Sequence, residues 1–507
     1  MSKYNRIKSI GICGIDGITT VIECKPVDSA SFYVKILGYK YTDIKYKLIS
    51  FFDTKGIIVP KKGYIINIVD KRDYQHLATF DFAIMCLISM DIGIFSEKIV
   101  GFLKKSIVVG EVLINGTLKK VNGFTSIIEE FLKSKSSCLI SSYDNHEEAS
   151  LFPNGKEKRI YLIDSFYDFI DHRFSVFNGK LGAPAQENYT VDFNEVIGLI
   201  AAKRSLEIAI AGKHNALFYG SPGSGKTMLA KRLPTILPEL TSKEFIDVSK
   251  IRSLEGNFTF SMQPPFRNPH YSISPAGLIG GGKEYSCGEV SRAHHGVLFL
   301  DEFTQFRLNT IELLRQVMED RKVEIVRHQV SYSYPASCIL IAMLNPCPCG
   351  YYGTQKCMCS IYQIQNYLKK ISGPILDRFD MHLGIQPVDQ AEILSKNKQN
   401  IESSAVIKKR VQRARVLQMQ RNDGVCNGYL SSSQVDKYCS MQGEAKDFLN
   451  KIFDSLNISM RSYYKIIKVA RTIADLKEKE KIEISDITEA LMYRSFDKLK
   501  SKVGIDE

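Results

Sequence analysis

Apolar and polar positions follow different spacings along the chain and divide it into three regions. Up to about residue 145, short runs rich in Gly and β-branched residues alternate with turns, which is typical of a mixed α/β unit. Apolar runs at 215–219, 297–300 and 338–344 are separated by helical stretches, the pattern of a parallel sheet covered by helices. From about residue 390, apolar residues recur at helical spacing, so the last region is predicted to be helical.

Two polar stretches punctuated by Pro and Gly, at 152–155 and 178–184, have the composition of linkers. A chain of 507 residues also exceeds the size at which one hydrophobic core keeps growing. We therefore predict an N-terminal domain with its linker at 1–185, a central α/β core at 186–390 and a helical domain at 391–507. Ser485 is predicted to cap the last helix.

The composition, with 44% hydrophobic and 24% charged residues, is that of an ordinary globular protein. The most apolar stretch, 82–90, lies between two aspartates and is too short to cross a bilayer. The first ten residues lack the apolar core of a signal peptide. We expect a cytoplasmic protein without a membrane partner.

The net charge of +13 favours a polyanionic partner such as nucleic acid. Lysine and isoleucine are abundant throughout and tryptophan is absent, which a compositionally biased genome would also produce. The total charge leaves both explanations open, because clustering rather than total charge marks a binding face.

A phosphate-binding loop follows the apolar run 215–219 and precedes a helical stretch, as the G-x-x-x-x-G-K-[ST] motif requires. Its backbone N–H groups would face the phosphates of ATP, with Lys226 on the β- and γ-phosphates and Thr227 on Mg²⁺. The alternative is a glycine turn that carries a lysine by chance, which the flanking elements disfavour. The loop consists of Gly220, Ser221, Pro222, Gly223, Ser224, Gly225, Lys226 and Thr227.

Polar residues follow the two other apolar runs. Asp301 and Glu302 come directly after 297–300, where the carboxyl ends of parallel strands bind ligands. Asp301 is predicted to hold Mg²⁺ through water, and Glu302 to act as general base for the attacking water. Asn345 follows 338–344 and is suited to orienting that water or sensing the γ-phosphate, although alone it would be a turn residue.

Four of the twelve cysteines form two C-x-C pairs directly after Asn345. Four thiolates so close can complete a tetrahedral shell, so we predict a structural Zn²⁺. The alternative is a loop of reduced cysteines held by packing. The four residues are Cys347, Cys349, Cys357 and Cys359.

The stretch 192–387 closely resembles the ComM/YifB family of bacterial AAA+ proteins, which are relatives of the magnesium-chelatase ATPase subunit. The resemblance is carried by HNALFYGSPGSGKTMLAKRLPTILPEL, PPFRNPHYSIS, GEVSRAHHGVLFLDEF, AMLNPCPCG and SGPILDRFDMHL, and continues as SMRSYYKIIKVARTIADL. It implies a Lon-protease-like N-terminal domain with an S5-like fold, a central AAA+ P-loop ATPase domain and a C-terminal helical lid.

The resemblance also implies roles for two arginines. Arg378 lies where the family places the arginine finger, and Arg461 where it places the sensor-2 residue. Because an arginine finger can come from a neighbouring subunit, a homo-hexameric ring follows. Outside the family context, Arg378 would be read as a surface salt bridge with Asp377 or Asp380.

Proteolysis is not expected of the N-terminal domain. Lon chemistry needs a Ser nucleophile and a Lys base, but the position expected to hold the lysine carries Thr125. The expected serine region, 77–81, contains no serine.

Relatives resembling ComM act as branch-migration helicases during recombination and natural transformation, which implies single-stranded or branched DNA as partner, with other recombination proteins as further ones. The alternatives are a chelatase-like or MoxR-like ATPase that remodels a protein, and a Lon-like binding module with a vestigial motor, which the intact nucleotide motifs disfavour. Candidate phosphate contacts, each also readable as an ordinary surface residue, are Arg267, His270, Lys283 and Arg292.

Overall fold

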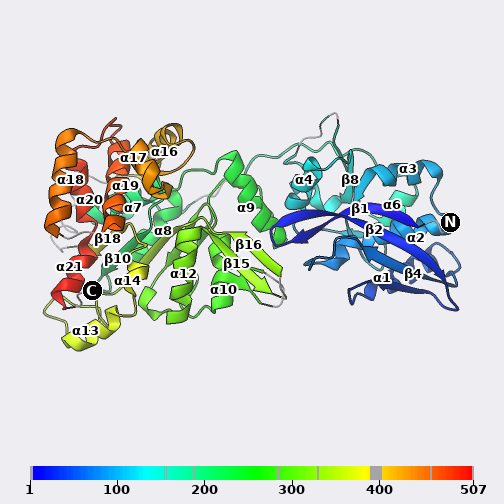
Figure 1. The fold of residues 1–507 in the computed structure, drawn as a ribbon, viewed down its shortest axis with the longest axis horizontal. Coiled ribbons are helices and arrows are strands. Elements are labelled where there is room, and N and C mark those ends of the chain that lie inside the picture. The colour runs from blue at the N-terminus through cyan, green and yellow to red at the C-terminus, as the bar shows by residue number, and fades with distance from the viewer. Residues whose placement is uncertain are drawn as a thin grey trace.

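The computed structural model describes residues 4–152, 155, 157–185, 189–282, 286–327, 330–388, 402–456 and 459–504. It is elongated, with the N-terminal domain at one end, the α/β core in the middle and the helical region at the other end (Figure 1). The two chain termini accordingly lie far apart in the molecule.

The N-terminal domain is built on a seven-stranded mixed sheet with the order β3-β4-β2-β1-β5-β8-β9. The long β1/β2 hairpin is antiparallel, whereas β5, β8 and β9 run parallel to β1. The strands are β1 Asn5–Cys13, β2 Asp16–Asp28, β3 Tyr33–Ile36, β4 Lys62–Ile68, β5 Ser106–Val108, β8 Cys138–Ser142 and β9 Arg159–Ile163, with a small ribbon of β6 Glu111–Val112 and β7 Leu118–Lys119. The helices are α1 Asp43–Thr54, α2 Asp81–Ile92, α3 Glu97–Lys105, α4 Phe124–Lys133, α5 His146–Ala149 and α6 Phe166–Ile170.

The central domain is built on a five-stranded parallel sheet with the order β11-β14-β17-β10-β18. Its strands are β10 Ala216–Gly220, β11 Phe266–Arg267, β14 Val297–Leu300, β17 Ile339–Leu344 and β18 Met381–Ile385. Its helices are α7 Ile200–Gly212, α8 Lys226–Ile236, α9 Ser242–Leu254, α10 Pro275–Ile279, α11 Glu289–Arg292, α12 Leu308–Asp320, α13 Ile361–Leu368 and α14 Gly373–Leu376. Two antiparallel ribbons complete it: β12 Gly280–Gly281 with β13 Ser286–Cys287, and β15 Lys322–Arg327 with β16 Val330–Pro335.

The period of two along each strand divides the buried residues of this sheet between two cores. Phe218 and Phe299 belong to a core that continues into the C-terminal helices, whereas Leu217 and Leu298 point to a core formed with α12 and α13. Burial on both faces explains why these strands are continuous apolar runs.

The C-terminal helices are α16 Ser404–Arg421, α17 Ser432–Tyr438, α18 Gly443–Leu456, α19 Met460–Leu476, α20 Ile484–Met492 and α21 Ser495–Lys502. The cap predicted at Ser485 is wrong. The N-cap of α20 is Glu483, whose carboxylate forms a capping box with Asp486, and α21 follows α20 as a further helix. The box satisfies the free N–H groups that a Ser cap would otherwise serve.

Candidate nucleotide site

The predicted phosphate loop connects β10 to α8 at the carboxyl edge of the central sheet, and α8 begins at Lys226. Gly223 and Gly225 have φ values of +75° and +86°, a region that disfavours other residues. A Cβ at Gly220 would lie 2.5 Å from the carbonyl oxygen of Ile385. The glycines are therefore required by backbone conformation and by close packing against β18.

Lys226 lies inside this loop. Its Nζ donates hydrogen bonds to the carbonyl oxygens of Gly220 and Ser221, at 2.6 and 2.9 Å, and to Oδ1 of Asn345 at 3.2 Å. Burial lowers the pKa of Lys226. A partly buried ammonium group at a helix N-terminus provides the charge that a polyphosphate needs, so the loop fits ATP.

The residues predicted to hold Mg²⁺ lie together. Oγ1 of Thr227 donates to Oδ2 of Asp301 at 3.2 Å, so the hydroxyl of the loop meets the carboxylate at the end of β14. An oxygen pair of this kind matches the ligand preference of Mg²⁺. The donor set therefore fits this ion.

Glu302 has a left-handed backbone conformation, with φ 51° and ψ 43°. This conformation is unfavourable for a residue with a Cβ, and such strain clusters at functional sites. The backbone N–H of Glu302 donates to Oδ1 of Asp301 at 2.9 Å. This bond and the turn fix both carboxylates at the mouth of the loop.

A cavity of about 350 Å³ unites these residues. It is lined by residues 222–228 together with Asp301, Glu302 and Asn345. Thr304, Gln305 and Tyr367 also line it and carried no recognisable sequence signal. Oγ1 of Thr304 lies 2.5 Å from the hydroxyl of Tyr367, which ties the segment after Glu302 to α13.

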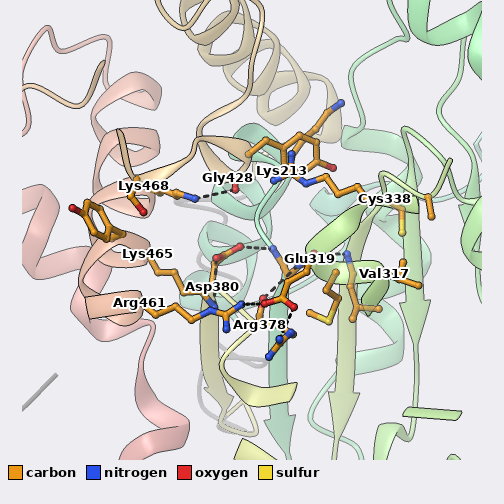
Figure 2. Close-up of a pocket in the computed structure, with 18 residues that line it drawn as sticks. Lys213, Val317, Glu319, Cys338, Arg378, Asp380, Gly428, Arg461, Lys465 and Lys468 are labelled. Atoms are coloured by element: carbon orange, nitrogen blue, oxygen red, sulfur yellow. Dashed lines mark hydrogen bonds and ion pairs between the residues drawn. The ribbon is translucent and has the colours of Figure 1, made fainter. Parts of the chain in front are cut away.

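The two predicted arginines lie together in a second pocket, shown in Figure 2. Nη2 of Arg378 lies 2.7 Å from Oε2 of Glu319, and Nη2 of Arg461 lies 2.8 Å from Oε1 of the same carboxylate. The side chain of Arg378 is only 6% exposed. The partner of Arg378 is therefore Glu319, a residue on α12, rather than either neighbouring aspartate.

This arginine pocket lies at the amino edge of the central sheet. Asn215, Cys338 and Asp380 line it, and each comes directly before a strand. The phosphate loop lies at the carboxyl edge, and the two cavities share no lining residue among those described. Because β10 spans five residues, roughly 16 Å separates the two edges.

The arginine pocket has an excess of positive charge. Among the described residues, six cationic side chains and two carboxylates line it. Burial, assisted by the charges of Arg494 and Arg461 and opposed by Asp380, lowers the pKa of Lys465 to about 8. The lining therefore carries a net positive charge, although Glu319 takes both arginines and Lys213 pairs with Glu244 at 2.7 Å. Its cations are Lys213, Arg321, Arg378, Arg461, Lys465 and Lys468.

The four predicted zinc ligands converge in the loop after β17. Their Sγ atoms all lie within 4.8 Å of one another, with 3.3 Å between Cys347 and Cys349 and 3.7 Å between Cys349 and Cys357. A tetrahedral zinc shell with Zn–S bonds of about 2.3 Å places sulfur atoms roughly 3.8 Å apart. A backbone hydrogen bond from Tyr351 lowers the pKa of Cys349 to about 6, which favours the thiolate. The donor set, completed by Cys359, fits Zn²⁺.

The predicted phosphate contacts are not a free basic surface. Arg267 forms two bonds with Glu289, at 2.6 and 2.8 Å, and Arg292 is bonded to Glu289 and Glu255. Neutralisation by these carboxylates weighs against the expected phosphate contacts of both arginines. His270 is exposed and bonded to a neighbouring serine. Lys283 lies outside the described residues.

Thr125, at the expected lysine position of the Lon-like domain, is buried at the junction with the central domain. Its N–H and its hydroxyl both donate to Oε2 of Glu148 at 2.8 Å, and Ser253 of α9 donates to the same oxygen at 2.5 Å. In the expected serine region, residues 77–80 form a short 3₁₀ helix, and Asp81 pairs with Lys47 at 2.6 Å. These contacts join α4 to α5 and α9, and α2 to α1. The absence of proteolysis stays a prediction.

The parallel sheet, the phosphate loop and the carboxylate pair at its edge define a P-loop ATPase of the AAA+ class. The family model described as magnesium chelatase, subunit ChlI, matches residues 192–393, and that of the ChlI C-terminal region matches 401–494. Among the described residues, no helix is both long and apolar enough to span a membrane.

Comparison with known proteins identifies the family within this class. The chain is 37% identical to competence protein ComM of Haemophilus influenzae over 417 residues, 79% of this chain and 80% of that protein. It is 36% identical to YifB of Escherichia coli over 395 residues, 77% of each chain. It is also 26% identical to Lon protease 2 of Bacillus subtilis over 141 residues, 26% of each chain. The chain therefore belongs to the ComM/YifB family of AAA+ ATPases.

Proposed function

We propose that this ATPase works as a ring, most simply a homo-hexamer, in which each nucleotide site is completed by the arginine pocket of the next copy. The observation that carries the proposal is the placement of the two half-sites at opposite edges of one sheet. At roughly 16 Å, Arg378 cannot reach a phosphate held by its own loop. A second copy can place its amino edge over the carboxyl edge of the first.

In this arrangement, residues of one copy bind ATP and activate the attacking water. Residues of the next copy stabilise the charge that develops on the transferred phosphoryl group. Lys226 neutralises the β- and γ-phosphates, and Thr227 and Asp301 hold Mg²⁺, which supplies further positive charge when bound. Glu302 accepts the proton of the water that attacks the γ-phosphorus as the bond to the ADP oxygen breaks. Arg378 of the neighbouring copy stabilises the charge that develops on the transferred group.

Mixing two inactive variants tests whether each nucleotide site is shared between two copies of the chain. Lys226→Ala disables the loop and Arg378→Ala the arginine pocket, so neither variant alone should hydrolyse ATP. In a 1:1 mixture that exchanges subunits, about one interface in four joins an intact loop to an intact pocket, and activity should return. Hydrolysis at the normal rate by Arg378→Ala alone would refute the proposal.

We further infer that the motor acts on DNA as a branch-migration helicase. Similarity to a competence protein and the net charge of +13 support this substrate. Because contacts would be mainly to phosphates, binding should depend little on sequence and fall steeply with salt.

A strand-exchange assay on synthetic three- and four-stranded junctions, with ATP or a non-hydrolysable analogue, tests the DNA inference. Exchange should require hydrolysis. Equal exchange with the analogue, or no DNA binding at low salt, would contradict the inference and favour an ATPase that remodels a protein partner. Neither result would affect the shared nucleotide site, which is tested by subunit mixing.

We also propose a structural Zn²⁺ at the four-cysteine loop. The loop packs directly on the phosphate loop, because a Cβ at Gly350 would lie 2.6 Å from Cδ of Pro222. A fourfold thiolate shell leaves no open coordination position, so its role is to fix the loop rather than to catalyse.

A further inference from the structure

We propose that Glu319 is a positioning residue that holds Arg378 and Arg461 as one unit, so that both guanidinium groups enter the neighbouring copy's nucleotide site together. The inference rests on the proposed function and adds a residue that no motif marks. Glu319 itself need not touch the nucleotide.

The geometry of the three side chains carries the first step. Each carboxylate oxygen of Glu319 takes one guanidinium, with Arg378 on Oε2 at 2.7 Å and Arg461 on Oε1 at 2.8 Å (Figure 2). Nη1 of Arg378 also donates to the carbonyl oxygen of Pro374 at 2.5 Å, which fixes that guanidinium on a second side. Glu319 thus bridges the end of α14 and the start of α19.

Electrostatics carries the second step. Two guanidinium groups in a pocket with an excess of cations repel each other, and Arg461 lies in the first turn of α19, where the helix dipole is also positive. Hydrogen bonds from Arg378 and then Arg461 lower the pKa of Glu319, so the carboxylate is ionised at neutral pH. Removing its charge should let the two arginines separate without removing either.

The third step is the helix that carries Glu319. The chain runs from Glu302 through residues 303–307 into α12, whose penultimate residue is Glu319. The face of α12 formed by Thr310, Ile311, Leu314 and Val317 is buried. Oγ of Ser372 donates to Oε1 of Glu312 at 2.8 Å, tying α12 to the segment before Arg378. α12 therefore connects the nucleotide site of its own copy to Glu319, which holds the two arginines that enter the nucleotide site of the neighbouring copy.

The test uses Glu319→Gln in the full-length chain, with Asp320→Asn as matched control. Asp320 is the exposed neighbour of Glu319, so the control removes the same charge one residue away. Because a small misplacement of a catalytic group can cost about 10²-fold, kcat should fall roughly 10- to 100-fold in Glu319→Gln while KM for ATP is unchanged. The control should retain the normal kcat.

Subunit mixing separates a positioning role from a general loss of structure. Glu319→Gln should recover activity when mixed with Lys226→Ala, because the defect lies on the arginine side of the interface. It should recover none with Arg378→Ala, since both variants supply defective arginine pockets. Glu319→Asp, which keeps the charge on a shorter side chain, should fall between wild type and Glu319→Gln.

The outcomes also separate this inference from the proposed function. Normal hydrolysis by Glu319→Gln, with Arg378→Ala inactive, would overturn the role of Glu319 and leave the shared site standing. Recovery between Glu319→Gln and Arg378→Ala would likewise overturn it. Normal hydrolysis by Arg378→Ala would instead refute the shared site itself.

Discussion

Lys226 donates a hydrogen bond to Asn345 across 3.2 Å, which links the phosphate loop to the end of the neighbouring strand β17. The contact places the amide within the cavity that Glu302 also lines. Asn345 can therefore orient both the lysine and the attacking water.

Replacing Asn345 with Ala should lower kcat for ATP hydrolysis by on the order of 10²-fold, the usual cost of removing one oriented polar group. Nucleotide affinity should change little, because Lys226 and the loop backbone remain. Steady-state kinetics together with binding of a fluorescent ATP analogue measure the two effects. Equal losses in affinity and kcat would assign Asn345 to binding instead.

Glu302→Gln should bind ATP with Mg²⁺ but not cleave it, since the metal-binding residues remain while the proton acceptor is lost. Lys226→Ala should weaken binding itself because the phosphates lose their partly buried cation. Filter binding and a phosphate-release assay distinguish the two variants. Hydrolysis at the normal rate in Glu302→Gln would move the catalytic base elsewhere.

Protein purified without chelators should contain about one zinc ion per chain, as expected of a single four-thiolate site. The Cys347→Ser/Cys349→Ser variant should lose the metal and melt at a lower temperature. Cys426, which lies outside the cluster, provides a control as Cys426→Ser. If the protein contained no zinc and the double variant were as stable as the control, a loop of reduced cysteines held by packing would be favoured instead.

The free energy of unfolding should rise with pH between about 4 and 6.5 because of His294. Burial, with help from the charge of His295, lowers its pKa from 6.5 to about 3, and its Nδ1 accepts a hydrogen bond from the N–H of Ser337 at 2.9 Å. The unfolded chain then binds one proton more than the folded chain, which contributes a slope of up to about 1.4 kcal/mol per pH unit. The stability is fully present above pH 6.5 and is lost as the pH falls.

Denaturant unfolding at several pH values measures this slope. His294→Asn should flatten the slope, because an amide can accept the same bond without titrating. His270→Asn is the control, since His270 is exposed. An unchanged slope in His294→Asn between pH 4.5 and 6.5 would contradict this prediction, because the lowered pKa values of the nearby carboxyl groups Asp247 and Glu244 affect stability mainly below that range.

The chemistry that is local in the chain could be predicted before the fold was known. The phosphate loop is eight consecutive residues, so its glycines and lysine keep their relation in any fold that places a strand before and a helix after them. The apolar run at 297–300 likewise predicts both a buried strand and the edge at which Asp301 and Glu302 emerge. The cysteine loop could be read for the same reason, because its four ligands lie within 13 residues.

Contacts between side chains that are distant in the chain could not be predicted in this way. Glu319 is separated from Arg378 by 59 positions and from Arg461 by 142, and no spacing rule connects a residue of α12, the turn after α14 and the start of α19. The same applies to Glu289 beside Arg267, to Glu255 beside Arg292, and to the contact of Thr125 with Glu148. Ion pairs of this kind depend on how helices pack against the sheet, and packing is set by the whole core rather than by any local pattern.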